Sequence, residues 1–180
     1  MIHTLPIAPT KWWIDPIQSD VLIKARHSVV AYISGSLNKF SGYIDVQDNQ
    51  VQDASIEFIL DIKNQAIALE NVDGPMLSND YLDTDGFPFV SFKSLSFQKI
   101  NPHINFLKGA LTINNTTKIV ELEAELLDIK TCNGSQKALF EITGKINRKD
   151  FQLTTNSYKQ AGGIVLGPDV KLIANLEFTV

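Results

Sequence analysis

The chain has 180 residues and a hydrophobic fraction of 44%, which suits one globular domain with a core. It carries 20 acidic and 16 basic residues, a formal net charge of −4, and no run of basic residues. This pattern argues against nucleic acid or an anionic membrane surface as a partner. No apolar stretch approaches the ~18 residues of a membrane span, so we expect no stable membrane insertion.

The N-terminal residues differ in composition from the rest of the chain. Residues 1–10 contain no Lys or Arg and no continuous apolar stretch, so they do not resemble a secretory signal. We interpret 1–10 as a flexible tail that precedes a single domain over 11–180, and we expect a cytoplasmic location. The indole of Trp13 should pack at the start of that domain.

Alternating apolar and polar residues dominate the chain from residue 20 onward. Ala54, Ile56 and Phe58 share one face of an expected strand, for example, and Ser55 and Glu57 share the other. One solvent-exposed face and one buried face are typical of an antiparallel sheet that curls on itself. The pattern therefore predicts an all-β fold, an eight-stranded antiparallel barrel. Its expected strands are 20–27, 33–47, 51–60, 89–99, 103–113, 117–129, 136–147 and 169–180.

Short turn sequences separate most of these strands. Asp48-Asn49, Asn101-Pro102 and Asn114-Asn115 each join two neighbouring strands. Asn133-Gly134 is the strongest hairpin signal, because a type I′ turn needs a positive φ at both central residues.

Residues 62–88, between the third and fourth strands, break the alternation. Ala66 to Glu70 have helix-forming character and Gly74-Pro75 ends that piece, so we expect a short helical insertion. Such an insertion is either a lid over a ligand or a plug over the barrel end. The residues expected to cover the opening are Met76, Leu77, Tyr81 and Leu82. The loop over 162–167 is an alternative gate.

The sequence offers little for catalysis. The three histidines lack the spacing of a metal site, and no nucleophile motif or phosphate-binding glycine loop is present. Cys132, the one cysteine, has no evident partner base, and a single cysteine excludes an internal disulfide. We therefore expect no enzyme activity, no metal and no cofactor.

Eight antiparallel strands closed into a barrel leave an interior that side chains fill or that holds one small ligand. Large inward residues alternate with small ones such as Gly109 and Gly144, which fits a lined cavity or tight interdigitation. If a cavity exists, we expect an elongated apolar one. Its expected lining is Val21, Ile23, Ile56, Phe58, Val90, Phe92, Leu111, Phe140 and Ile142.

Four ordered segments resemble those of the YceI family, bacterial lipocalin-like barrels that bind isoprenoid and other long-chain lipids. The first runs from Trp13-Ile14-Asp15-Pro16 through Ser19 to His27, followed by Gly35. The others are Phe87-Pro88-x-Val90-x-Phe92-Lys93-Ser94, Gly109-x-Leu111-Thr112-Ile113 with Thr117-Lys118, and Gly144-x-Ile146-Asn147-Arg148-x-Asp150-Phe151.

The resemblance implies non-catalytic binding, carriage or sequestration of a long-chain amphiphilic lipid, such as a polyisoprenoid, quinone or fatty acyl derivative. The family's Arg-Asp-x-His-Leu element is represented here only by Asp73, so Arg26 and His27 are the candidates for the polar end of a ligand. The alternative is a structural or interaction module with a side-chain-filled barrel that acts through its outer surface. A homodimer stays open as a further partner.

Overall fold

The computed structural model describes residues 8–25, 28–62, 66–67, 76–77, 86, 88–152 and 169–180. Within these residues the regular structure consists of strands and short 3-10 turns, with no α-helix. The turns are η1 (Pro16–Gln18), η2 (Gly35–Leu37) and η4 (Arg148–Phe151). The strands of the main sheet are β1 (Thr10–Ile14), β2 (Asp20–Ala25), β3 (Ser28–Ser34), β4 (Lys39–Gln47), β5 (Gln50–Asp61), β8 (Phe89–Lys99), β9 (Ile104–Ile113), β10 (Thr116–Cys132), β11 (Ser135–Asn147) and β12 (Asp169–Thr179).

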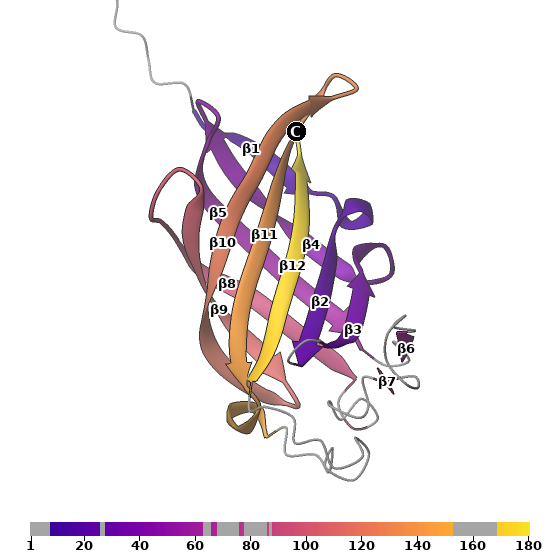
Figure 1. Ribbon diagram of the computed structural model, residues 1–180. Coiled ribbons are helices and arrows are strands. Elements are labelled where there is room, and N and C mark those ends of the chain that lie inside the picture. The colour runs from indigo at the N-terminus through magenta and orange to yellow at the C-terminus, as the bar shows by residue number, and fades with distance from the viewer. Residues whose placement is uncertain are drawn as a thin grey trace, which may run out of the picture.

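Eight of these strands close into an antiparallel barrel in the order β1-β4-β5-β8-β9-β10-β11-β12 (Figure 1). The ring closes where β1 pairs with the end of β12, with Trp13 opposite Thr179 and Ile14 opposite Phe178. The predicted eight-stranded barrel is confirmed, but its strands differ from those expected. Thr10–Ile14 is a barrel strand that the alternation did not reveal, and the predicted strand 33–47 contains η2 between β3 and β4.

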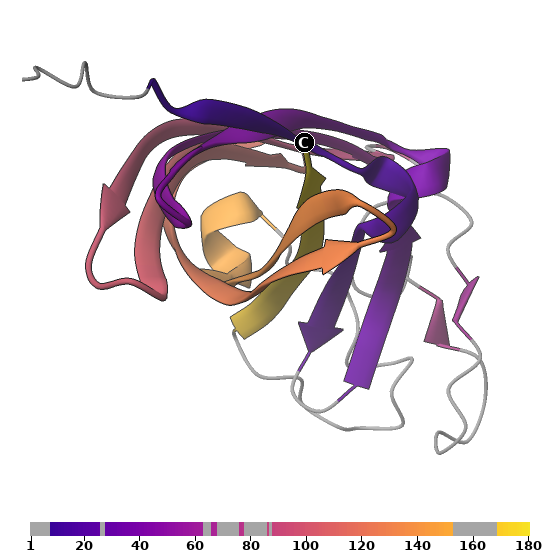
Figure 2. The same ribbon diagram turned by 90° about the horizontal axis from the view of Figure 1, so that it is seen from above.

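The β2–β3 hairpin extends the sheet beyond the ring. β2 pairs with the first half of β12. The last residues of β12 pair along the same edge with β1. β3 pairs with β2 alone among the described strands, and Figure 2 shows both strands diverging from the ring. The first strand predicted from the sequence therefore belongs to this extension.

The expected hairpin turns are present. Asp48 and Asn49 have φ of 52° and 58°, Asn114 and Asn115 have 51° and 57°, and Asn133 and Gly134 have 51° and 81°. Asn and Asp tolerate this left-handed region better than other non-glycine residues do, so these short turns join their strands directly.

The helical insertion expected between the third and fourth strands is wrong where the structure describes it. Ala66–Ile67 (β6) and Met76–Leu77 (β7) are two short antiparallel strands that pair with each other. Both lie against β3. Pairing with Met76–Leu77 has overridden the helix-forming character of Ala66 and Ile67. The rest of 63–85 lies outside the described residues.

The buried indole at the start of the domain belongs to Trp12, and not to Trp13 as expected from the sequence. Trp12 faces the barrel core and is 3% exposed, whereas Trp13 faces outward and is 55% exposed. Trp13 instead packs edge-on against Tyr43 of β4, with 5.5 Å between ring centroids. Successive side chains of a strand point to opposite faces, so only one of the two indoles can enter the core.

The chain turns between β1 and β2 at a compact polar corner. Asp15 accepts a hydrogen bond from the backbone N–H of Ile17 in η1 and donates its own N–H to Glu177 O of β12 at 2.7 Å. Ser19, 3% exposed, donates to Asp15 O at 2.7 Å and accepts from Glu177 N at 3.1 Å. Gly35 packs so closely here that an added Cβ would lie 2.2 Å from Pro16 O. This corner lets β12 pair first with β2 and then with β1.

Candidate functional site

The described residues line two cavities inside the barrel. The larger, about 380 Å³ including space open to solvent, is lined in part by the second half of β11 and the first half of β12, the strand segments toward the lower end of the barrel in Figure 1. Its lining residues are Val21, Phe58, Leu60, Val90, Phe92, Leu111, Leu122, Ile142, Gly144, Leu172 and Ala174. The smaller, about 210 Å³ on the same measure, lies nearer the C-terminus of the chain. Its lining residues are Ile44, Ala54, Ile56, Phe97, Leu107, Ala124, Phe140, Ile142 and Phe178.

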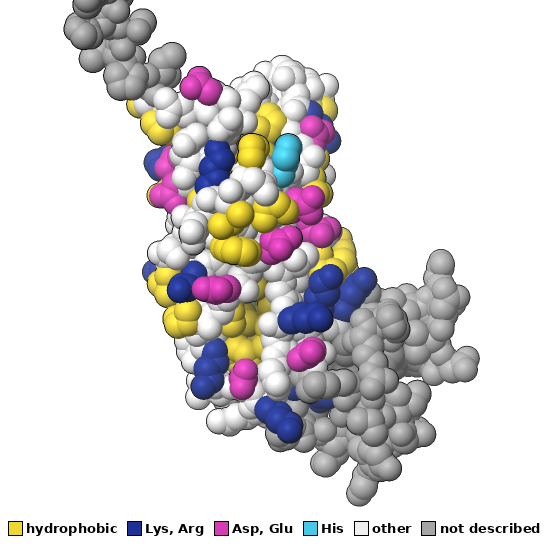
Figure 3. Space-filling view, turned by 60° about the vertical axis from the view of Figure 1, so that its left-hand side comes forward, with side chains coloured by type: hydrophobic (Ala, Val, Ile, Leu, Met, Phe, Trp, Pro, Cys, Tyr) yellow, Lys and Arg dark blue, Asp and Glu magenta, His cyan; other side chains and the backbone are white. Residues whose placement is uncertain are grey.

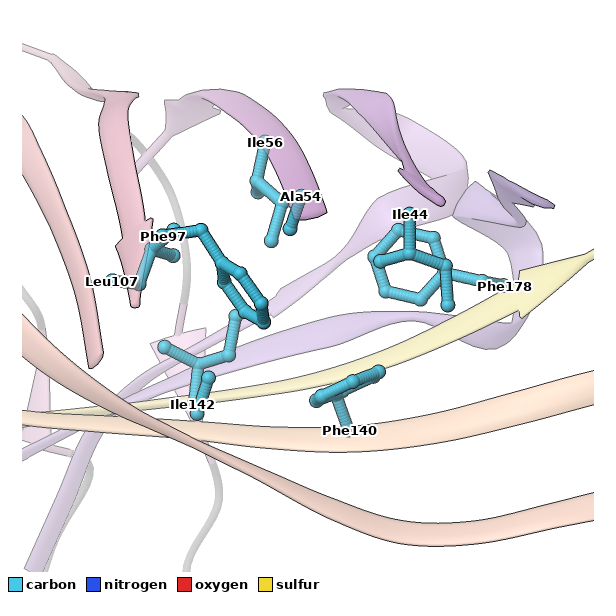
Figure 4. Close-up of a pocket in the computed structure, with 9 residues that line it drawn as sticks. Ile44, Ala54, Ile56, Phe97, Leu107, Phe140, Ile142 and Phe178 are labelled. Atoms are coloured by element: carbon cyan, nitrogen blue, oxygen red, sulfur yellow. The ribbon is translucent and has the colours of Figure 1, made fainter. Parts of the chain in front are cut away.

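Both cavities are apolar. Every residue that lines them is aliphatic, aromatic or glycine. In the smaller cavity, side chains from β4, β5, β8, β9, β11 and β12 converge on the free space (Figure 4). Ile142 of β11 lines both cavities, so the two adjoin at this side chain. The residues that line these two cavities offer apolar contacts and no group for acid–base or nucleophilic chemistry.

The sequence-predicted lining residues are brought together. Six of them line the larger cavity: Val21, Phe58, Val90, Phe92, Leu111 and Ile142. Ile56 and Phe140 line the smaller one with Ile142. Ile23 is buried at 2% exposure but lines neither cavity.

The predicted polar end and most of the predicted lid are not placed. Arg26, His27, Tyr81 and Leu82 lie outside the described residues. Met76 and Leu77 form β7, and the structure defines only their backbone. The roles assigned to these residues stay predictions.

Several lining residues were not singled out from the sequence. Leu122 and Ala174 stand on alternating stripes that the sequence shows clearly, so the same signal could have included them. Phe97 could not be found this way, because a bulge between Ser94 and Ser96 changes the register of β8. A bulge reverses which residues of a strand face inward beyond it.

Two glycines make room for large side chains on neighbouring strands. A Cβ on Gly109 would lie 2.3 Å from the ring of Phe92, and one on Gly144 would lie 2.2 Å from Leu122 Cδ2. Real Cβ atoms do not come this close, so a side chain at Gly144 would push the end of Leu122 aside, and one at Gly109 would also meet the backbone oxygen of Lys93 at 2.7 Å. Large and small residues therefore interdigitate at these two places, and a cavity remains beside both.

The lower end of the barrel is partly covered by η4. In Figure 2 this turn lies within the ring, and in Figure 1 it lies beneath it. Its Phe151 is 1% exposed and its Arg148 is 8% exposed. Asn114, in the β9–β10 turn, donates from Nδ2 to the carbonyl oxygens of Phe151 and Gln152, both at 3.3 Å. The fourth sequence segment thus forms a cap that is hydrogen-bonded to the third.

The strongest charge pair near the barrel wall is structural. Lys137 Nζ lies 2.6 Å from Glu177 Oε1, and Glu177 is 7% exposed. The hydrogen bond to Glu177 holds the pKa of Lys137 above its usual value, against the opposing effect of desolvation. This pair stabilises the corner where the barrel closes and faces neither cavity. Within the described ranges, no group of His, Cys, Asp or Glu is arranged to hold a metal ion.

Comparison with known families accounts for this arrangement. The model of the YceI-like domain matches residues 12–178. The chain belongs to the YceI-like family. A UPF0312 protein of Staphylococcus epidermidis is 28% identical over 175 residues, covering 95% of this chain and 98% of the relative. A UPF0312 protein of Staphylococcus aureus strain N315 is also 28% identical, over 178 residues, with the same coverage of both chains.

Solved structures share the fold of this YceI-like chain. BcnA of Burkholderia cenocepacia superposes with a TM-score of 0.61 at 16% identity, covering 91% of this chain and 98% of BcnA. The YceI protein of Campylobacter jejuni gives 0.58 at 23% identity, covering 79% and 81%. A polyisoprenoid binding domain from Saccharophagus degradans gives 0.56 at 11% identity, covering 93% and 97%. No helix in the described part of the chain is long and apolar enough to cross a membrane.

Proposed function

We propose that this YceI-like barrel binds one long-chain amphiphilic lipid, with the hydrocarbon tail inside the barrel, and carries or sequesters it. The observation that carries this proposal is the larger cavity, which is lined by apolar residues alone. Membership of the YceI-like family and the similarity to a polyisoprenoid binding domain support it. A polyisoprenoid, a quinone or a fatty acyl derivative fits this chemistry.

The tail supplies most of the binding free energy in this proposal. Each methylene removed from water contributes about 0.8 kcal/mol, so length can replace polar contacts. The space open to a water-sized sphere is only about 30 Å³ in the larger cavity and about 10 Å³ in the smaller. A single water needs about 10–15 Å³ on this measure, so a tail enters only if lining side chains move. We therefore expect a long tail to displace Ile142, at which the two cavities adjoin.

Arg26 and His27 are our proposed partners of the lipid head group. They follow β2 directly in the sequence, and the neighbouring inward residues Val21 and Ile23 are buried. We propose a binding role and not a catalytic one, because no titratable side chain is among the described residues that line the two cavities.

Substitution of Ala174 tests where the tail lies. Ala174 is 5% exposed and lines the larger cavity, so Ala174→Phe should fill that space and abolish retention of a fluorescent long-chain lipid. Ile173→Phe is the matched control, because it adds a ring at the adjacent, outward-facing residue of β12 and should leave retention unchanged. Mass spectrometry of lipids extracted from the purified wild-type protein would identify the natural ligand.

Thermal unfolding of both variants distinguishes a blocked cavity from a damaged fold. Leu122→Ala provides a second measurement, because it enlarges the same cavity and should preserve or increase retention. Equal retention in Ala174→Phe and the wild type would contradict a ligand in this cavity. Absence of any extracted or bound lipid would instead favour the alternative, a side-chain-filled module that acts through its outer surface.

A further inference from the structure

Three lysines from distant parts of the sequence form one row on the outside of the barrel. Lys145 of β11 lies directly opposite Lys171 of β12, and Lys171 lies directly opposite Lys24 of β2. Neighbouring strands are about 4.8 Å apart, so the row spans roughly 10 Å across three strands. Lys145 and Lys171 are exposed and Lys24 is half-buried. No basic run in the sequence reveals this row, because only the sheet register assembles it.

The row is not neutralised by its neighbours. None of the three lysines makes an ion pair with any other described residue. Glu121 on the adjacent strand β10 pairs with Lys108 at 3.5 Å. In the next outward row toward the strand ends, Asp169 lies opposite Asn147 and is the carboxylate among the described residues of that row. Like charges directly opposite each other in a sheet are destabilising, so folding alone does not favour such a row.

The row lies on the outer wall of the larger cavity. Lys171 and Lys145 are adjacent in sequence to Leu172 and Gly144, which line that cavity from within. β2, β11 and β12 all end or begin within a few residues of the row, at the lower end of the barrel in Figure 1. Figure 3 shows Lys and Arg side chains on the lower half of one face, some of them beside the grey segments, with Asp and Glu side chains among them.

The outward rows farther from this end carry a different charge. The next row pairs Thr143 with Ile173 and Leu22, which bear no charge. The row after it pairs Glu141 with Asn175 and Asp20. The charge on this face thus changes from basic to acidic along the barrel axis. An extended anionic surface would therefore meet the lower end of the barrel and be repelled by the upper part of this face.

We propose that Lys24, Lys145 and Lys171 form a docking surface for membranes that contain anionic lipid, holding the lower end of the barrel at the bilayer surface. A planar anionic surface fits a row that is exposed at a strand end and spans three strands. Lysine is suited to diffuse phosphate contacts of this kind, because its ammonium is a compact point charge on a flexible stem. The inference goes beyond the proposed lipid binding and does not depend on what the barrel holds.

Vesicle sedimentation tests this surface. The wild-type protein should bind vesicles of mixed phosphatidylglycerol and phosphatidylcholine, should not bind phosphatidylcholine alone, and should dissociate at high salt. Each lysine near an anionic surface is worth about fivefold in affinity, so the double variant Lys145→Gln/Lys171→Gln should bind roughly 25-fold more weakly. The matched control is Lys99→Gln/Lys130→Gln, which removes the same charge from exposed lysines at the opposite end and should change little.

Each contrary result overturns the docking surface. No binding of the wild type to anionic vesicles would do so directly. An equal loss in the two double variants would show that only net charge matters. Binding of the wild type to duplex DNA that Lys145→Gln/Lys171→Gln weakens, without binding to vesicles, would assign the row to a nucleic acid instead.

Discussion

Ser19 links η1 to β12 at the corner that closes the barrel. Its buried hydroxyl bridges Asp15 O and Glu177 N, and no water-exposed side is available to replace either bond. Ser19→Ala should lower the free energy of unfolding by roughly 1–3 kcal/mol, the cost of leaving a buried polar group unsatisfied. Urea unfolding measures the loss. Ser135→Ala, at an exposed hairpin position, is the control and should stay within about 0.5 kcal/mol of the wild type. An equal loss of unfolding free energy in the two variants would contradict a stabilising role of Ser19 at this corner.

The strands that the sequence revealed are those whose alternation is uninterrupted. In β9, in β12 and in β5 from Ala54 onward, inward and outward residues alternate regularly, so both their positions and their cavity-facing residues could be predicted. β1 was missed because it is only five residues long and two adjacent tryptophans conceal its alternation. Phe97 was missed because the register of β8 changes before it. β6 and β7 were missed because they pair with each other within a segment of helical propensity. Local patterns report neither bulges nor partners distant in sequence.

The lysine row on β11, β12 and β2 is a second feature that no local pattern reports, and it should cost stability. Lys171→Glu places a carboxylate between Lys24 and Lys145, replacing two repulsive pairs with two attractive ones. Urea unfolding at low salt should show a gain of roughly 0.5 kcal/mol, which high salt removes. Lys171→Gln is the control, because it removes the repulsion without adding attraction and should give a smaller gain. A loss of stability in both variants would mean that the lysine side chains stabilise the sheet through packing.

At the scale of the whole molecule, ladders between the described strands close the barrel only in its upper half. β1 joins β12 to β4 there, but β1 pairs with β4 only over Tyr43–Val46. Below that, no ladder joins β3 to the first residues of β4 among the described strands. At the top of this seam Asn38 donates to Ser34 O at 2.8 Å and accepts from Asp61 N at 2.6 Å. The described pieces of the insertion, β6 and β7, lie against β3 and so flank the seam.

We expect the predicted lid to control lipid entry between β3 and β4. A lipid that enters whole requires part of the barrel to move, and the seam between β3 and β4 can open without breaking a ladder. We therefore expect a bound lipid to slow hydrogen exchange in β3 and at Met76–Leu77, where the insertion pairs. Exchange in β9 and β10, inside the closed ladder, should stay unchanged. Ala174→Phe, whose cavity is filled, should show no lipid-dependent change at all. Protection confined to 160–168 would move the entrance to the loop before β12, and protection spread evenly over the chain would show global stabilisation without a gate.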